Sequence, residues 1–251
     1  MAIVNDFFIS SNSVDGISEE SYDNLDKFLD IIDSFARTSY QSIYIIDYFK
    51  KDFLYVSENP LFLCGLSSEE VKKLGYSFYV NYVPSEEQNM LVEINSAGFK
   101  FFSRLPLEDR TKYTISYDFH LINHNRKILI NHKLTPSVLA EDGKIWLATC
   151  VVSLSSRTSI GHIEIRKMNQ MTYWGYSLES HKWKEKESLT LNTKEKHILY
   201  LSAQGYTMNE IAEKLYLAVD TIKFYKRRLF DKLEVKNIAE ALSYVTNYKL
   251  L

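Results

Sequence analysis

Cysteine is scarce in this chain, which has only Cys64 and Cys150. Neither lies in a CxxC pair or beside a histidine cluster, so their spacing argues against a disulfide framework and a cysteine zinc site. We therefore expect two buried, reduced thiols. Glycine is scarce too: the chain has 8, with no GxSxG motif and no glycine-rich phosphate loop. These absences give no support to catalysis, and we predict that the protein is not an enzyme.

Long hydrophobic runs are also missing. No apolar segment approaches the roughly 18 residues needed to span a bilayer. The N-terminal MAIVNDFFISSNSVDG lacks the basic start and the long apolar stretch of a secretory signal. With 45% hydrophobic and 14% aromatic residues, the chain can nevertheless bury a substantial core. These features predict a folded, cytoplasmic protein that does not insert into a membrane and has one or, more naturally, two domains.

The formal net charge is only −2, but it is unevenly distributed. Residues 188–251 contain 10 Lys and Arg against 7 Asp and Glu, a balance of +3, whereas residues 1–187 have a balance of −5. Proline is absent beyond Pro136, which favours a compact helical module at the C-terminal end. A polyanionic partner would therefore bind this last quarter of the chain.

Helix and strand signals alternate over the first 155 residues. Residues 18–36 predict an amphipathic helix because apolar side chains recur at helical spacing: Tyr22, Leu25, Phe28, Leu29, Ile32 and Phe35. Two short helical segments are expected within residues 61–75, and a longer helix begins near Pro84. Alternating β-branched and aromatic residues predict strands at residues 42–47, 53–57, 113–122, 127–134 and 145–154.

This order of two strands, several helices and three strands resembles a PAS domain. The residues that carry the resemblance are the block YIID…FLYVSENPLFLCGLSSEEVKKLG and the hairpin YDFHLINHNRKILINHKLTP, within about residues 38–155. The resemblance implies a sensory or dimerising module with a cavity between the sheet and the helices. Cys64 lies outside the motif that flavin-binding PAS domains use, and no histidine stands out as a haem ligand. We therefore expect no cofactor.

The aromatic residues of this region leave two alternatives open. They could line an apolar ligand cavity, or they could form a packed core, which we favour. A ligand pocket, if formed, would involve Tyr44, Phe62, Phe78, Tyr117, Phe119 and His132. His120, His124 and His132 are close in sequence, but strand alternation turns them to different faces, so we predict no metal site.

The last sixty residues carry repeated signals for helix starts. NTKE (192–195), TMNE (207–210) and NIAE (237–240) each have the form of a capping box. Gly205 ends the first of these helices. We expect a small helical bundle with helices near residues 192–203, 207–215, 220–234 and 237–249.

The third of these helices has two different faces. Its packing face comprises Ile222, Tyr225, Leu229 and Leu233, and its outer face comprises Lys223, Phe224, Arg227, Arg228 and Asp231. A packed inner face combined with an outer face that presents Lys and Arg suits insertion into the major groove of DNA.

The segment LNTKEKHILYLSAQGYTMNEIAEKLYLAVDTIKFYKRRLFDKLEV resembles the LuxR-type helix-turn-helix family, within about residues 190–248. The resemblance implies a fourth, dimerising helix from Asn237. It places Lys223, Phe224 and Arg227 toward the bases and assigns DNA-backbone contacts to Lys194, Thr207, Thr221, Lys226 and Arg228. Ala218 departs from the family, which usually has a capping Ser there, so Asp220 could cap this helix one turn later.

Together these observations predict an α+β chain with four parts. They are an N-terminal tail and amphipathic helix (1–37), a PAS-like sensory domain (38–155), a β-hairpin-like connector (156–187) and a LuxR-type helix-turn-helix domain (188–251). We expect a homodimeric, sequence-specific transcription regulator that binds double-stranded DNA and senses a small-molecule or protein signal. The alternative is a PAS-like protein-interaction module, with constitutive or partner-gated DNA binding and no small-molecule ligand.

Overall fold

The computed structural model describes residues 4–248 and residue 250. The chain forms two compact units. The first contains the described residues up to Leu154 together with Ser159–Glu187, and the second contains Ser155–Thr158 and the described residues from Ser188 onward. No helix in the described part of the chain is both long and apolar enough to cross a bilayer.

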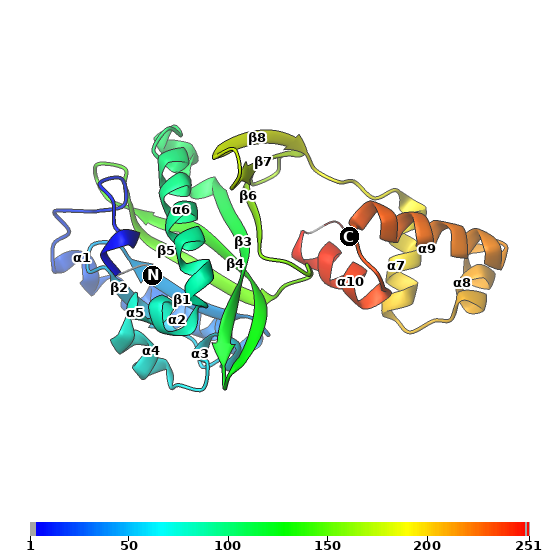
Figure 1. Cartoon of the computed structure of the whole chain (residues 1–251), viewed down its shortest axis with the longest axis horizontal. Helices are drawn as coiled ribbons and strands as arrows, with labels where there is room; N and C mark the ends of the chain where they lie inside the picture. Colours follow the sequence, from blue (N-terminus) through cyan, green and yellow to red (C-terminus); the bar gives the residue numbers. More distant parts are fainter. Residues whose placement is uncertain (1–3, 249, 251) are drawn as a thin grey trace. The chain divides into compact units, whose positions relative to one another are not determined.

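The first unit is built on one antiparallel sheet of eight strands in the order β2-β1-β5-β4-β3-β6-β7-β8 (Figure 1). The strands are β1 (Ser42–Asp47), β2 (Asp52–Val56), β3 (Tyr113–Asn123), β4 (Arg126–Leu139), β5 (Ile145–Leu154), β6 (Gly161–Lys167), β7 (Thr172–Ser177) and β8 (Lys182–Glu187). Its helices are η1 (Val4–Phe7), α1 (Glu20–Asp23), α2 (Asp26–Thr38), α3 (Pro60–Leu63), α4 (Ser68–Leu74), α5 (Ser77–Tyr82), α6 (Ser85–Phe102) and η2 (Leu107–Lys112).

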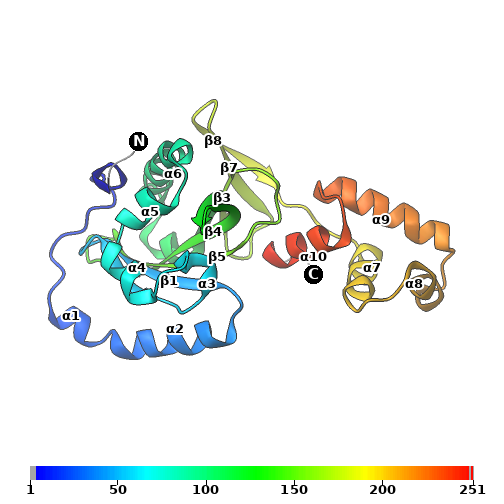
Figure 2. The same ribbon diagram turned by 60° about the horizontal axis from the view of Figure 1, so that its bottom comes forward.

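Strand alternation gives this sheet two buried faces. On β1, Tyr44 and Ile46 belong to the main core beneath α3–α6, whereas Ile45 packs with residues of α2. Figure 2 shows α2 on one side of the sheet and α5 and α6 on the other. Because successive side chains of a strand point to opposite faces, the central residues 43–46 of β1 are all apolar or aromatic, and all six residues of the strand, including Ser42 and Asp47 at its ends, are buried. The predicted PAS-like sheet with flanking helices is thus confirmed.

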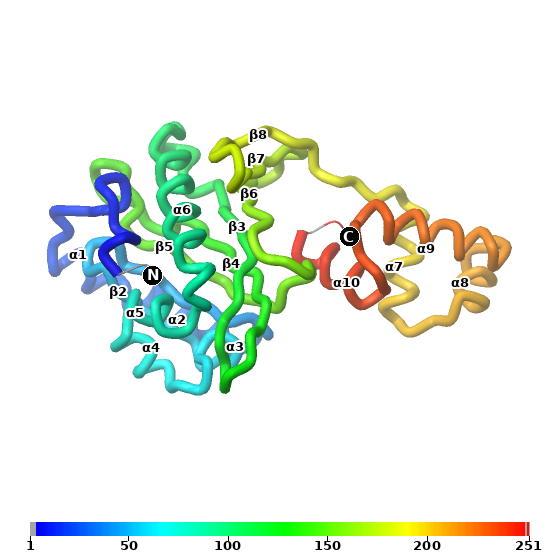
Figure 3. The backbone as a smooth tube through the Cα atoms, in the orientation of Figure 1, coloured from blue at the N-terminus to red at the C-terminus, as the bar shows by residue number. Residues whose placement is uncertain are grey.

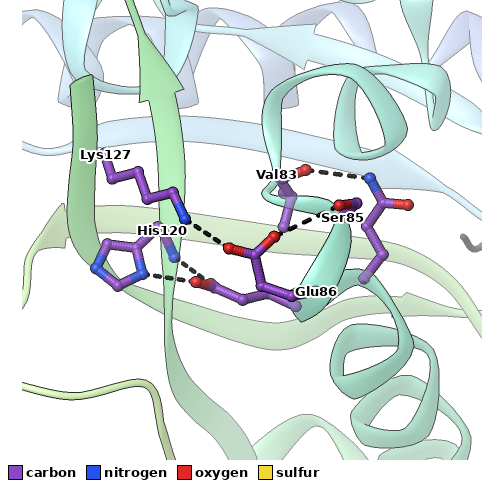
Figure 4. Close-up of polar contacts among 7 residues, drawn as sticks. Val83, Ser85, Glu86, His120 and Lys127 are labelled. Atoms are coloured by element: carbon purple, nitrogen blue, oxygen red, sulfur yellow. Dashed lines mark hydrogen bonds and ion pairs between the residues drawn. The ribbon is translucent and has the colours of Figure 1, made fainter. Parts of the chain in front are cut away.

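The β3–β4 hairpin is joined to the start of α6 by carboxylates (Figure 4). Glu87 accepts a hydrogen bond from the backbone N–H of His120 at 2.8 Å, and its Oε1 lies 2.7 Å from His120 Nδ1. Glu86 Oε1 lies 2.5 Å from Lys127 Nζ. Both carboxylates lie in the first turn of α6, where the helix dipole favours negative charge. His120 is therefore held by Glu87 of α6, whereas His132 lies in the core and takes no part in this contact.

Strands β6, β7 and β8 differ from the predicted connector. They continue the sheet beyond β3, with Ile115 opposite Ile165, and the tube in Figure 3 follows them in yellow-green. Trp174 and Trp183 pack on Phe101 of α6, with ring centroids 5.4 and 5.3 Å from that of Phe101. Residues 161–187 therefore form part of the first unit rather than a free hairpin between domains.

Two further expectations need correction in this unit. Phe35 was expected on the packing face of the amphipathic helix, but it is 59% exposed: α2 packs on the sheet through Phe28, Leu29 and Ile32, whereas Phe35 lies in the last turn of α2, beyond these contacts. Helix α5 was not expected, since its sequence SFYVNY is short and rich in residues typical of strands. Both cysteines are buried and free, as expected.

The second unit contains α7 (Thr193–Ala203), α8 (Met208–Leu215), α9 (Val219–Leu233) and α10 (Ile238–Asn247). Capping boxes open α7 at Asn192 and α8 at Thr207. At α10, Asn237 caps the helix, but Glu240 accepts from the backbone N–H of Lys236 instead of completing the expected box. The short segment Ser155–Thr158 groups with these helices, and the Arg157 guanidinium lies 4.7 Å from the ring centroid of Tyr244.

Candidate nucleic-acid interface

Helix α9 buries one side and exposes the other. Ile222, Leu229 and Leu233 are buried, and two small cores use them: Ile222 packs with Ile211 and Ala212 of α8, whereas Leu229 and Leu233 pack with residues of α7 and α10. The side chain of Tyr225 contributes to the first of these cores. Three neighbouring helices therefore fix the rotation of α9 about its own axis.

The opposite side of α9 presents the three residues assigned to the bases. Lys223, Phe224 and Arg227 are all exposed, and Phe224 is exposed by 61%. The Lys223 ammonium lies 2.9 Å from the Asp220 carboxylate, in a pair that is itself exposed. Such exposed pairs contribute at most about 1 kcal/mol, so a stronger anion can replace Asp220 as the partner of Lys223. The outer face is therefore available to a polyanion.

The five residues assigned to the DNA backbone lie on three elements. Thr221, Lys226 and Arg228 lie on α9, Lys194 lies in the first turn of α7, and Thr207 precedes α8. The Thr207 hydroxyl is engaged locally, since it donates to Glu210 Oε2 at 2.7 Å and accepts from the Glu210 backbone N–H at 3.4 Å. Any phosphate contact of Thr207 must share this hydroxyl with the cap of α8.

An ion pair links the first helix of this unit to the last turn of α9. The Lys232 ammonium lies 2.9 Å from Glu195 Oε2, and only 3% of the Glu195 side chain is exposed. The same carboxylate accepts the backbone N–H of Asn192. Burial by itself raises the pKa of Glu195, but the hydrogen bonds from Lys232 and Asn192 outweigh it and leave this pKa below its ordinary value. The Glu195 carboxylate is therefore ionised and holds α9 against α7.

The start of α9 lacks a side-chain cap, as the Ala218 departure indicated. Ala218 occupies the N-cap position and its side chain can accept no hydrogen bond. Asp220 was considered as a later cap, but the helix already begins at Val219, so Asp220 lies within the first turn and pairs with Lys223. The N-cap position of α9 is therefore Ala218 and not Asp220, and the first turn begins at Val219.

Sequence reasoning missed one exposed aromatic residue in the turn between α8 and α9. Tyr216 is 95% exposed and has a left-handed backbone with φ of 53° at the end of α8. A left-handed residue at a helix end is usually glycine or asparagine, so a Tyr there is unusual. The signal available in the sequence was its position directly after Leu215, where α8 ends.

The interior of the first unit contains the residues proposed for a ligand pocket. Tyr44 stacks on Phe62 with ring centroids 4.2 Å apart, and Phe78 packs on Phe62 at 4.6 Å. The Tyr44 hydroxyl bonds to Tyr79 and lies 2.5 Å from His132 Nε2. Phe119 is fully buried, and Tyr117 stacks on it with centroids 5.8 Å apart. These six residues therefore form one contiguous aromatic and polar cluster.

A small cavity adjoins this cluster between α6 and the sheet. Its lining includes Asn95, Gly98 and Phe102 of α6 and Ile115 and Tyr117 of β3. The space within it open to water is about 20 Å³, room for about one water molecule. Of the six proposed pocket residues, Tyr117 lines this cavity, and the other five pack against one another beside it.

Burial lowers the pKa of His132 to about 3, because the charged imidazolium would lose its hydration. His132 is therefore neutral, and its Nδ1 has no hydrogen-bond partner among the described residues. A buried ring nitrogen without a partner is costly.

The C-terminal segment can be placed in a family. The model of a family described as bacterial regulatory proteins, luxR family, matches residues 189–245. These residues form a LuxR-type helix-turn-helix domain. The LuxR-type domain comprises α7 to α9 and most of α10, including the helix with the exposed basic face.

Curated relatives share the LuxR-type domain. The chain is 41% identical over 61 residues to the oxygen regulatory protein NreC of Staphylococcus carnosus, and equally identical over 61 residues to NreC of Staphylococcus aureus. The match takes in 24% of this chain and 28% of each NreC chain. The chain thus spans little more than a quarter of the length of these relatives.

Solved structures are similar over longer spans. A structure of the Vibrio cholerae VqmA dimer shares 16% identity at a TM-score of 0.35, with 87% of this chain and 86% of that chain covered. The PAS domain of a protein from Colwellia psychrerythraea shares 14% identity at a TM-score of 0.37, with 51% of this chain and 97% of that chain covered.

Proposed function

We propose that this protein is a sequence-specific DNA-binding transcription regulator that acts as a homodimer. The observation that carries the proposal is the division of α9 into a locked inner face, with Ile222 and Leu229 buried, and an exposed face with Lys223 and Arg227. In a helix-turn-helix domain such a helix enters the major groove, where phosphate contacts fix its register and Arg or Lys reads guanine.

The expected contacts divide into two groups. Lys223, Phe224 and Arg227 face the bases, and the DNA backbone is contacted by Lys194, Thr207, Thr221, Lys226 and Arg228. Two copies related by a two-fold axis would contact half-sites about one helical turn apart. The surfaces we propose for dimerisation are α10 and the exposed side of α2, where Ile31 and Phe35 are uncovered.

The test separates base reading from backbone binding. Full-length protein first selects a duplex from a random pool, and its affinity is then measured over a range of salt concentrations. We expect Arg227→Ala to weaken binding to the selected duplex by about 1 to 3 kcal/mol and to relax preference at one base position. Lys194→Ala is expected to weaken binding to all DNA sequences alike. It should also reduce the steepness of the plot of log affinity against log salt concentration by about 1. Normal binding by the Arg227→Ala protein would show that α9 is not the reading helix.

We further propose that the PAS-like unit receives the signal that controls DNA binding. Its unpartnered His132 Nδ1 and the cavity beside Tyr117 favour a small polar ligand. The stacked Tyr44 and Phe62 rings, and the room for about one water molecule, favour the alternative of a protein partner with no small-molecule ligand.

The two alternatives differ in what the purified full-length protein retains. A small-molecule receptor is expected to carry a ligand visible by native mass spectrometry, or to melt at a higher temperature with a member of a metabolite panel. His132→Phe should abolish that shift without changing DNA affinity in the absence of ligand. If the protein carries no bound species and no compound shifts its melting temperature, the result counts against a small-molecule sensor pocket and favours the protein-partner alternative.

A further inference from the structure

Phe224 is an anomaly on the outer face of α9. It is 61% exposed among basic residues, on a helix whose other large apolar residues are buried, like Ile222 and Leu229, or half-buried, like Phe230. Its described aromatic contact is the edge of Tyr225, with ring centroids 5.9 Å apart. A phenyl ring has no hydrogen-bond donor or acceptor. Phe224 therefore neither supports the fold nor can make the polar contacts available to Lys223 and Arg227.

The major groove offers one apolar feature, the C5-methyl group of thymine, and Phe is among the side chains that contact it. Phe224 and Arg227 are three residues apart, so they lie on the same face of α9 with a rise of about 4.5 Å between them. Successive base pairs are about 3.4 Å apart. An apolar contact by Phe224 thus falls within about two base pairs of a guanine contacted by Arg227.

We propose that Phe224 is a specificity-determining residue that reads a thymine methyl group in each half-site, within about two base pairs of the guanine read by Arg227. This inference rests on the proposed function, since it requires α9 to lie in the major groove. It adds that part of the sequence preference comes from apolar contact and not from hydrogen bonding alone.

The test removes the methyl group without altering base pairing. In the duplex selected by the full-length protein, each thymine is replaced in turn by deoxyuridine, which lacks only the C5-methyl group. We expect the wild-type protein to lose about 4-fold in affinity at one thymine per half-site, the scale of one buried methyl group. The Phe224→Ala protein should bind both duplexes equally, to within about 1.5-fold. Phe224→Leu, which stays apolar, should keep part of the discrimination.

The matched control is Tyr200→Ala, which removes another exposed aromatic side chain, on α7. This variant should discriminate thymine from deoxyuridine as the wild type does. If the wild type binds its duplex but is indifferent to every replacement, or if Phe224→Ala discriminates equally well, Phe224 does not read thymine, although DNA binding stands. If the wild type selects no duplex at all, the proposed function itself fails, and the role of Phe224 fails with it.

Discussion

The two units of this chain place their polar groups in opposite ways. The PAS-like unit takes hydrogen-bonding side chains into its interior, where Tyr44 meets His132 and Asn131 donates to Asp118 at 3.0 Å. The LuxR-type domain buries mainly apolar side chains, with Glu195 as the buried carboxylate. The first unit therefore depends on internal polar chemistry, which a guest molecule or a proton can disturb. The second unit combines two small apolar cores and its helix caps with the buried Glu195–Lys232 ion pair, and the outer face of α9 stays exposed.

The three tryptophans allow the units to be followed separately. Trp146, Trp174 and Trp183 all lie in the first unit, so their fluorescence reports its unfolding, whereas far-ultraviolet circular dichroism also reports the helices of the second.

The largest effect is expected at the buried carboxylate of the second unit. Glu195→Ala leaves the Lys232 ammonium and the Asn192 N–H without their acceptor, and should cost about 2 to 4 kcal/mol of stability. Denaturation followed by circular dichroism should show an early loss of helix, while the tryptophan transition stays in place. The control is the double variant with both Glu195→Ala and Lys232→Met. It should recover part of the lost stability, because it also removes the ammonium that Glu195→Ala leaves without an acceptor. A tryptophan transition that moves equally would contradict the independence of the two units.

A smaller effect is expected from acid on the first unit. The pKa of His132 is lowered to about 3 in the folded protein, against about 6.5 for an unfolded histidine. Between these values the unfolded chain binds the additional proton, so stability must fall as the pH falls. We expect a loss of about 2 kcal/mol from about pH 7 to about pH 5, measured as the tryptophan transition in urea. His132→Gln should flatten this dependence; an equally steep one would show that other groups cause it.

The smallest effect is expected at the start of α9. Ala218→Ser adds a hydroxyl that can accept the backbone N–H of Thr221, and should stabilise the second unit by about 1 kcal/mol. Thr207→Ala is the matched control, because it removes the existing cap of α8. It should destabilise the second unit by about the same amount. Circular dichroism melts of the two variants should shift in opposite directions. An Ala218→Ser protein that melts no higher than the wild type would indicate that the turn before α9 cannot present the hydroxyl.

Local signals in the sequence predicted many elements of both units well. Strand β1 has the expected bounds, because SIYIID carries a strong strand signal, and the caps at Asn192 and Thr207 located two helix starts. The exposed placement of Lys223 and Arg227 also followed from helical periodicity.

What the sequence could not predict depends on contacts between distant segments. The pairing of β6 with the free edge of β3 joins Ile165 to Ile115, a partnership that no local pattern encodes. The exposure of Phe35 reflects which turn of α2 meets the sheet. The meeting of Tyr44, Tyr79 and His132 joins three separate elements, and the buried Glu195–Lys232 pair likewise joins α7 to α9.

The eighth strand ends the sheet with KWKEKE, in which five of the six residues are exposed. An edge strand with unsatisfied backbone groups is a template for uncontrolled addition of further strands, and natural proteins blunt such edges with charge, above all with lysine. In β8, Lys182, Lys184 and Lys186, with Glu185 and Glu187 beside them, place such charge along the edge. Without charge at its border, a sheet widened by three strands would offer its free edge to the same edge of another copy, and the charged β8 opposes that pairing.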